Sequence, residues 1–395
     1  MVTCLLDWEK AFDRLKPEKI AVALRKYRVP EQIITAIQAL YQNPTFWVEL
    51  NNTKSHKKQQ RRGIRQGCTL SPYLFIICMS AMFESIHRTD QMKANQHGRV
   101  RGTSFSELVY ADDTIIITDD VTSSQEELHQ IETHARYYGL SLNKDKCFAI
   151  LFNTQDEMAF MDGTPVTVTR EAIYLGVKIS STSDKKKELA ERLNQCAVTW
   201  RKLSPFWNKS NIPKRIKLTI YDALIRSKLV YGMESLYFTQ DVKSKVDAFQ
   251  LKGLRRILNL PPTHIDRANT NTKIFELANV ELNRGRKGPP RQIQQTSAYL
   301  ESKALSLLTH IIRLPQEDPL RQVTFTRDTL PNIYNKRRPG RPRAHWTIEN
   351  CRLAFHKLRD EQIPCPNIIH QDEDYDHKNP QHGVCLQHAA AQYLL

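Results

Sequence analysis

The sequence predicts an α+β fold, in which an antiparallel sheet with helices on one face is followed by a region built from helices alone. Two observations support this. Up to about residue 180, short apolar runs rich in β-branched residues alternate with helical patterns. From Lys185 onward, apolar residues recur only at helical spacing. Within the first region, two adjacent carboxylates, Asp112 and Asp113, stand between two strand-like runs and indicate the tip of a hairpin.

The first strand is expected at residues 2–6, a nearly continuous apolar run typical of a strand buried on both faces. Asp7 follows directly, and the end of a buried strand is a suitable place for a metal ligand. Two helices are expected to begin near Pro17 and Pro30, because proline is tolerated in the first helical turn.

A hairpin is predicted next, from residues 45–50 and 59–64. Its surroundings are rich in cations, with no acidic residue between them: Lys54, Lys57, Lys58, Arg61, Arg62 and Arg65. One interpretation is a solvated basic loop. In a chain this basic, contact with phosphate groups is an equally good interpretation.

The next loop leads into an apolar helix. Ser71 suits the N-cap and Pro72 the first helical position of a helix that runs through Ile86. Before it, Gly67 permits a close backbone approach, and Gln66 offers both a donor and an acceptor. A flat partner such as a base pair or a nucleotide would fit against this loop.

The paired carboxylates admit two interpretations. Aspartate is common in turns, so Asp112 and Asp113 alone need no metal. Neighbouring strand residues face opposite ways, so one of the two must point toward whatever faces the sheet. If the strand before Asp7 is a neighbour of this hairpin, three carboxylates converge, and with substrate phosphates they can hold two Mg²⁺ ions for nucleotidyl transfer.

Behind the hairpin, Ser124 and Glu127 form a capping-box pattern at the start of a helix that Gly139 ends. Strands are expected at residues 147–152 and 172–177. These elements complete the first domain, predicted to span residues 1–182.

Three amphipathic helices are expected between Lys185 and the break at Pro261-Pro262, which predicts a helical domain over residues 183–262. A basic C-terminal region, residues 263–395, would contain a linker, one helix and a run of cations. That run, residues 336–343, suits an import signal, an AT-hook-like minor-groove arm or a solvated segment. The Cys and His residues of the tail lack a standard zinc spacing.

Composition indicates a polyanionic partner. The 395 residues include 58 Lys and Arg against 42 Asp and Glu, a formal charge of +16. Nucleic acid is the first candidate and an anionic membrane surface the second. The apolar opening is too short for a signal peptide, and no run reaches the roughly 18 residues of a membrane span, so we expect an intracellular protein with no membrane partner. Its eight scattered cysteines suit reduced thiols.

Five motifs then occur in order: Leu6-Asp7 with Ala11-Phe12-Asp13, the run from Arg62 to Pro72, Tyr110-Ala111-Asp112-Asp113, Gly139 to Asn143 with Lys146, and Tyr174-Leu175-Gly176. In this order and spacing they resemble the reverse transcriptases of non-LTR (LINE-type) retrotransposons. The resemblance covers residues 1–180, and the helices that follow resemble the thumb region of that family more weakly.

The resemblance implies a right-hand polymerase palm followed by a helical thumb-like region. It implies an RNA-directed DNA polymerase that extends a DNA primer with dNTPs on an RNA template. Asp7 and Asp112 would bind two Mg²⁺ ions, with Mn²⁺ as an alternative, and Asp113 would assist.

Further roles follow from the same resemblance. Phe12 would be the steric gate that rejects ribonucleotides, and Lys146 would act as a proton donor near the pyrophosphate. The other substrate-binding residues would be Arg65, Gln66, Gly67 and Tyr110, and the primer grip would be Tyr174, Leu175 and Gly176.

One feature departs from the family pattern: only six residues precede Asp7, whereas family members carry a fingers region before this motif. We therefore expect a truncated part of a retroelement polyprotein, or a reading frame begun at an internal Met. The alternative function is a catalytically inactive nucleic-acid-binding remnant. The family also suggests a nuclear location, while the oligomeric state stays open.

Overall fold

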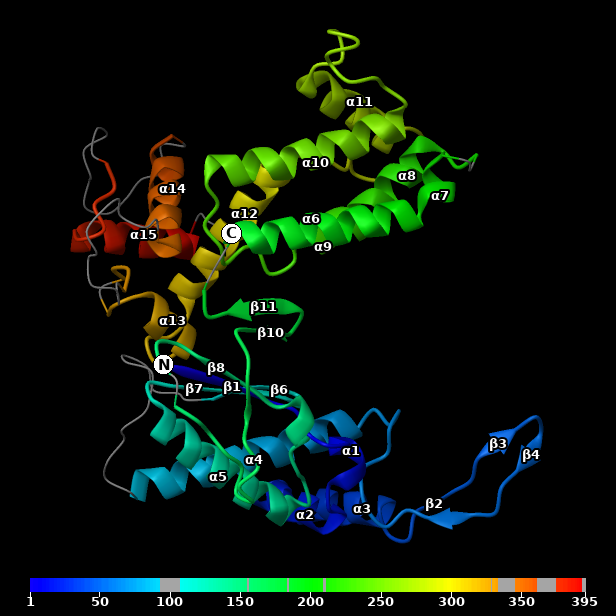
Figure 1. Ribbon diagram of the computed structural model, residues 1–395, viewed down its shortest axis with the longest axis vertical. Helices are drawn as coiled ribbons and strands as arrows, with labels where there is room; N and C mark the ends of the chain where they lie inside the picture. The colour runs from blue at the N-terminus through cyan, green and yellow to red at the C-terminus, as the bar shows by residue number, and fades with distance from the viewer. Residues whose placement is uncertain are drawn as a thin grey trace. The chain divides into compact units, whose positions relative to one another are not determined.

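The computed structural model describes residues 1–92, 107–154, 156–182, 185–208, 211–327, 329–332, 345–360 and 374–392 (Figure 1). The chain divides into two compact units, Met1–Ser183 and Asp184–Leu395. The basic run at 336–343, together with Cys365 and His370, lies outside the described residues.

A five-stranded sheet forms the centre of the first unit. Its strands are β1 (Val2–Leu6), β6 (Glu107–Tyr110), β7 (Asp113–Thr118), β8 (Phe148–Leu151) and β9 (Thr167–Val168), in the order β6-β7-β1-β8-β9. All neighbours are antiparallel except β8 and β9, which are parallel. All five residues of β1 are buried, as its continuous apolar run predicts.

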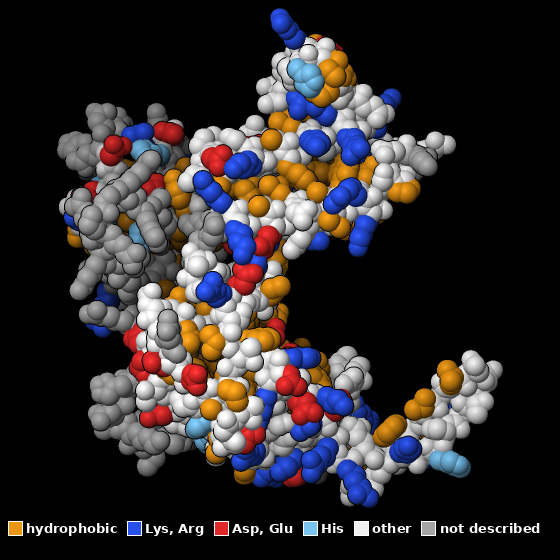
Figure 2. Space-filling view, viewed as in Figure 1, with side chains coloured by type: hydrophobic (Ala, Val, Ile, Leu, Met, Phe, Trp, Pro, Cys, Tyr) orange, Lys and Arg blue, Asp and Glu red, His pale blue; other side chains and the backbone are white. Residues whose placement is uncertain are grey.

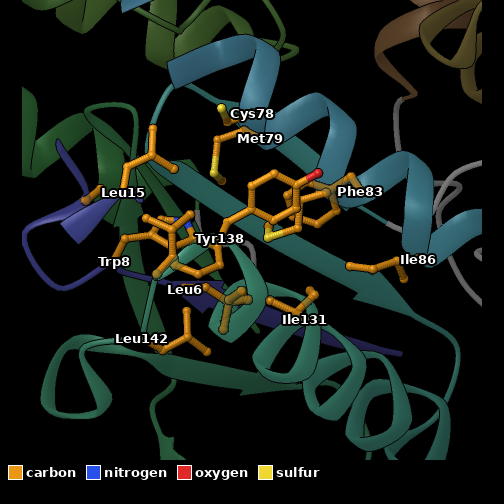
Figure 3. Close-up of a cluster of buried hydrophobic side chains, with 14 of the residues drawn as sticks. Leu6, Trp8, Leu15, Cys78, Met79, Phe83, Ile86, Ile131, Tyr138 and Leu142 are labelled. Atoms are coloured by element: carbon orange, nitrogen blue, oxygen red, sulfur yellow. The ribbon is translucent and has the colours of Figure 1, made fainter. Parts of the chain in front are cut away.

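Helices pack against one face of this sheet (Figure 1). They are α1 (Ala11–Arg14), α2 (Pro17–Lys26), α3 (Glu31–Leu40), α4 (Ser71–Met92) and α5 (Val121–Tyr138). Figure 3 shows Met79 and Phe83 of α4 near Tyr138 of α5, and Ile131 of α5 near Leu6 of β1, all within one core. Burying each such side chain contributes roughly 1.5–3 kcal/mol, which fixes the helices on the sheet. The predicted α+β class is confirmed.

A hairpin, not a single strand, covers the opposite face. Strands β10 (Glu171–Tyr174) and β11 (Val177–Ser180) are joined by Leu175 and Gly176, both with positive φ, at 47° and 75°. Positive φ at both central residues is the geometry of a tight hairpin turn. The prediction of one strand over 172–177 is therefore wrong. The first turn position holds leucine, whereas Asn, Asp or Gly is typical of such a turn.

A second hairpin forms an arm over residues 45–59, which extends away from the helices of this unit (Figure 1). Strand β2 (Thr45–Phe46) pairs with β5 (Lys58–Gln59), and β3 (Glu49–Leu50) pairs with β4 (Thr53–Lys54). The predicted return strand over 59–64 is wrong beyond Gln59. Ile64 is buried, and its backbone N–H donates to the carbonyl of Phe12 at 2.7 Å, which draws the chain back to the core.

The start of α5 also differs from the prediction. The Asp120 side chain caps the helix, accepting from the Ser123 backbone N–H at 2.8 Å. Ser124 is instead buried, with its hydroxyl 3.0 Å from that of Thr118. The capping-box interpretation was therefore wrong, whereas the end of the helix at a left-handed Gly139 is confirmed.

The second unit is helical. Its longer elements are α6 (Lys185–Lys202), α8 (Lys214–Ile220), α10 (Gln240–Leu258), α11 (Asn271–Asn283), α12 (Thr296–Arg313), α14 (Trp346–Asp360) and α15 (Pro380–Gln392), and shorter ones are α7 (Ser204–Asn208), α9 (Ser227–Val230) and α13 (Pro319–Thr324). The core around α6, α8 and α10 continues past residue 262, because α11 contributes Ile274 and Leu282 to it.

A π-helical segment, Tyr221–Arg226, shifts the buried face of the helix that begins at Lys214. Regular helical spacing after Pro213 predicts a buried face that includes Ile216 and Leu224, yet both are exposed, while Tyr221 and Ile225 are buried. The wider π-helical turn changes the phase of the side chains, which a pattern based on 3.6 residues per turn does not anticipate.

Two further expectations concern thiols and membranes. Cys4, Cys68, Cys78, Cys147, Cys196 and Cys351 are free, but Cys385 is disulfide-bonded, so the expectation of reduced thiols does not hold for that residue. Within the described residues, no helix has the length and apolar character that a bilayer span requires.

Candidate active site

The strand registers bring three predicted site residues into one row. In the pairing of β1 with β7, Leu6 lies opposite Thr114, so one further step places Asp7 beside Asp113. In the pairing of β1 with β8, Leu5 lies opposite Phe148, and two further steps place Asp7 beside Lys146. The ends of three adjacent strands therefore carry two carboxylates and an amine.

These side chains belong to the hairpin face of the sheet. Residues two apart in a strand point to the same face of the sheet. Leu5 and Ile115 pack on the hairpin face, so Asp7 and Asp113 point to that face as well. A cleft of about 410 Å³ lies there, lined by Asp7, Asp113 and Lys146, together with Leu5, Leu6, Thr114, Phe148, Thr169, Glu171, Ala172, Ile173 and Tyr174. Asp112 lies in the turn itself, between Ala111 and Asp113.

The charges of two other carboxylates act on Asp113. The pKa of Asp113 is raised, first by partial burial and then by the negative charges of Asp112 and Asp7. Mutual repulsion of this kind is relieved by a cation. Asp112 thus acts on Asp113 through its charge, although it is not among the residues that line the cleft.

The backbone around Asp7 is tightly held. Its carbonyl accepts from the Asn143 N–H at 2.8 Å, and its own N–H donates to the Cys147 sulfur at 3.4 Å. Burial raises the pKa of Cys147 to about 11, so the thiol accepts this bond without adding a negative charge. The loop at the end of β1 is therefore positioned by strand β8 and the segment before it.

Sequence reasoning did not anticipate a second bond that holds this corner. The indole Nε1–H of Trp8 donates to the hydroxyl of Thr114 at 3.1 Å, and both residues are buried. The bond ties the chain after Asp7 to the residue after Asp113. Its sequence signal, a tryptophan directly after a candidate ligand, has meaning only once the strand register is known.

Lys146 ends a short 3₁₀ turn, Lys144–Lys146, that leads into β8. Its ammonium is exposed and lines the cleft. Lys144 instead forms an ion pair with Asp162, away from the cleft residues. The same short turn therefore carries one lysine held by a carboxylate and one directed to the site.

Phe12, on α1, stacks on Phe75 of α4, with ring centroids 4.8 Å apart. Next to it, Asp13 accepts a hydrogen bond from the side-chain amide of Gln66 at 3.0 Å. A Cβ at Gly63 would lie only 2.7 Å from backbone atoms of Phe12 and Asp13, so glycine is needed there. The predicted nucleotide-pocket loop thus packs directly on the Phe12 turn, though neither Phe12 nor Gln66 lines the cleft described above.

The other predicted substrate-binding residues are exposed. Arg65 donates to the carbonyl of Leu40 at 3.0 Å, at the end of α3. Gly67 has a φ of 84°, and a Cβ there would meet open space, so its glycine serves the turn and not a close packing contact. Tyr110 is 65% exposed at the end of β6.

The predicted primer-grip residues form the end of the β10–β11 hairpin. The Tyr174 hydroxyl donates to the Leu108 carbonyl at 3.4 Å, and its ring lines the cleft. The pKa of Tyr174 is raised by burial and then by the charge of Asp113. Leu175 and Gly176 make the exposed turn.

The donor set suits a hard divalent cation, since it consists of carboxylates whose repulsion such an ion would relieve. Among the residues that the structure describes, no group of three or more His, Cys, Asp or Glu side chains is already close enough to hold a metal.

Comparison with known proteins identifies the first unit. Residues 2–179 match the reverse transcriptase (RNA-dependent DNA polymerase) family. A Pol polyprotein from the type-1 retrotransposable element R2 of Nasonia vitripennis is 30% identical over 37% of this chain and 14% of its own length. The RNA-directed DNA polymerase from the mobile element jockey of Drosophila melanogaster is 24% identical over 66% of this chain and 28% of its own.

The chain therefore spans less than a third of these relatives. Among solved structures, a telomerase from Candida tropicalis in complex with a fragment of telomeric RNA aligns with 78% of this chain and 46% of its own, at 13% identity and a TM-score of 0.40. Residues 2–179 thus carry a reverse transcriptase domain, and the relatives named above, to which the chain is similar, are proteins of mobile elements.

Proposed function

We propose that this chain is an RNA-directed DNA polymerase that extends a primer 3′-hydroxyl with dNTPs on an RNA template. The observation that supports this most directly is the row formed by Asp113, Asp7 and Lys146 at the ends of three paired strands, within a reverse transcriptase domain. In the reaction, a bond forms between the primer oxygen and the α-phosphorus, the α–β phosphoanhydride bond breaks, and pyrophosphate leaves.

The carboxylates would bind Mg²⁺, with Mn²⁺ as an alternative. Asp7 and Asp112 are the proposed ligands and Asp113 the assisting one, and two such ions supply Lewis-acid stabilisation to attacking and leaving oxygens. The raised pKa of Asp113 supports a site that is incomplete without positive charge. Lys146, exposed beside Asp7, would donate a proton to the departing pyrophosphate.

The surrounding residues would position the substrates. Phe12, fixed by its stack on Phe75, would exclude a 2′-hydroxyl. Gln66 and Gly67 would contact the new base pair, with Arg65 and Tyr110 beside them, and the hairpin turn after Tyr174 would support the primer end. The location proposed for this activity is the nucleus.

Primer extension on an RNA template with labelled dNTPs tests the proposal. Wild type should extend the primer only with Mg²⁺ or Mn²⁺ present, and Asp112→Asn and Asp113→Asn should each lose about a hundredfold or more of the rate. Asp119→Asn removes an exposed carboxylate beyond the far end of β7 and should leave the rate unchanged. Metal-dependent extension that survives both active-site substitutions would contradict these roles.

The alternative is an inactive nucleic-acid-binding remnant. The formal charge of +16 supports it, because such a charge attracts a polyanion whether or not the chain is catalytic. This alternative predicts salt-sensitive binding of RNA or of RNA/DNA hybrids without any primer extension by the wild type.

A further inference from the structure

The arm over residues 45–59 exposes apolar side chains that no other described element covers. Figure 2 shows them along the arm, at the lower right, beside basic side chains. Their exposed fractions are 46% for Phe46, 47% for Trp47, 62% for Val48 and 72% for Leu50. A lone two-stranded hairpin gains little stability from side chains left in water, so this composition indicates a surface that binds a partner.

Charge identifies the kind of partner. Residues 1–183 contain 22 Lys and Arg against 21 Asp and Glu, so this unit is almost neutral, at +1. Residues 45–65 alone contain six cations against one acid, Glu49, a balance of +5. The rest of the unit must therefore be negative, and the positive charge is concentrated on the arm and the loop that follows it. A local excess of this kind attracts phosphates.

The cations surround an aromatic ring. The ammonium groups of Lys54 and Lys57 lie 5.5 Å and 5.9 Å from the centre of the Trp47 ring. Lys54 also pairs with Glu49 at 3.7 Å, which neutralises the one acid of the arm. Lys57 and Lys58 form no ion pair with any described residue, so their charges are available to an external anion.

We propose that the arm binds single-stranded nucleic acid at a site separate from the catalytic cleft. Bases would stack on Trp47 and Phe46, and Lys57 and Lys58 would contact the phosphates. A single strand fits better than a duplex, because base pairing and stacking bury the faces that the aromatic rings need. A second copy of this chain fits poorly, since pairing two arms would bring two sets of uncompensated cations together.

This site goes beyond the proposed polymerase activity and does not depend on catalysis. Binding is therefore measured with the full chain in EDTA and without dNTPs, by fluorescence anisotropy of labelled single-stranded RNA and DNA of about 20 nucleotides. Trp47→Ala should weaken binding at least about fivefold, and Trp47→Phe should stay within about twofold of wild type because it keeps a ring. Lys57→Gln with Lys58→Gln should weaken binding and reduce its salt dependence.

Tyr137→Ala provides the matched control. Tyr137 is 48% exposed, and the Lys19 ammonium lies 3.4 Å from the centre of its ring, so the control removes a similar aromatic–lysine pair from α5. It should bind single strands like wild type. If Trp47→Ala loses affinity equally for RNA and DNA, the arm recognises bases and phosphates without contacting the 2′-hydroxyl. A loss confined to RNA or to DNA would identify that strand as the ligand.

Three outcomes would overturn the proposal: unchanged single-strand binding by Trp47→Ala, an equal loss of binding to a duplex of the same sequence, or a loss that Tyr137→Ala reproduces. Sedimentation that changes in Trp47→Ala without any change in binding would show a contact between copies instead. Because no step requires turnover, an inactive polymerase with normal Trp47-dependent binding would refute only the proposed catalysis.

Discussion

The folded protein disfavours the charged form of the Asp113 carboxyl. Partial burial and the charges of Asp112 and Asp7 raise its pKa, so the folded state favours its neutral form relative to the unfolded chain. Its contribution to stability is therefore complete below the ordinary carboxyl pKa and is lost as the pH rises through the raised folded-state value. A cation bound at the proposed metal site would remove this cost.

The first prediction is that Asp113→Asn will not be less stable than wild type at pH 7 and will be more stable by less than about 1 kcal/mol, a small value because the side chain is exposed. The difference should shrink toward about pH 3, where the wild-type carboxyl is neutral. Urea unfolding across this pH range measures it. Mg²⁺ should stabilise wild type more than the variant, and a variant that is clearly destabilised at pH 7 would contradict the reasoning.

A second prediction concerns Phe12. Phe12→Val should increase incorporation of ribonucleotides relative to deoxyribonucleotides by about tenfold or more, because a smaller side chain leaves room for a 2′-hydroxyl. The loss of the stack on Phe75 should also cost about 1–2 kcal/mol of unfolding free energy. Single-nucleotide extension with rNTP and dNTP measures the ratio. Phe12→Tyr, which keeps the ring, should discriminate as wild type does, and unchanged discrimination in Phe12→Val would exclude the gate.

At the scale of elements, local sequence patterns predicted the helices and strands whose formation depends on burying one apolar face. Neighbouring residues alone determine apolar periodicity and turn chemistry. These signals predicted the strand at residues 2–6, the helices after Pro17 and Pro30, and the end of a helix at the left-handed Gly139. A hairpin turn at Asp112 was predictable for the same reason, although Asp113 proves to be the first residue of β7.

What could not be predicted depends on contacts between distant residues. Leu175 adopts a positive φ that no local signal indicates. The bond from Trp8 to Thr114 requires a strand register that joins residues 106 positions apart. The sequence around Ser124 resembles a helix cap, but the side chain of Ser124 is buried. Candidate ligands were thus recognisable from sequence, whereas the bonds that position them were not.

The start of α5 provides the third prediction. Asp120→Ala should lower the unfolding free energy by about 1 kcal/mol, because it removes the cap of the Ser123 N–H at 2.8 Å. Asp119→Ala removes the same charge one residue earlier, from a side chain for which the structure records no cap bond, and should change stability by less than about 0.5 kcal/mol. Urea unfolding of both variants tests this, and equal effects would mean that charge and not the cap bond matters.

At the scale of the whole molecule, charge is unevenly divided between the two units. Residues 184–395 contain 36 Lys and Arg against 21 Asp and Glu, so they carry +15 of the total +16. Part of this charge borders a cavity of about 470 Å³ between α6 and α10, which has an apolar floor that includes Trp200 and Phe249. Arg201, Lys252 and Arg256 line it and are exposed. The sheet unit therefore carries the proposed chemistry, and the helical unit carries most of the attraction for a polyanion.

The fourth prediction follows from this division. Binding of an RNA/DNA duplex should weaken about a hundredfold or more between 50 and 200 mM salt, and replacing Lys252 and Arg256 together by Gln should lower the slope of log affinity against log salt by about 2. The matched control replaces Lys245 and Lys273 by Gln, because these exposed lysines already pair with Asp241 and Glu276. It removes the same net charge and should change the slope by less than about 1, since paired lysines release few counterions on binding. Anisotropy titrations across the salt range measure both slopes. Equal changes in the two double variants would show that net charge alone governs binding, and not the cations that line the cavity.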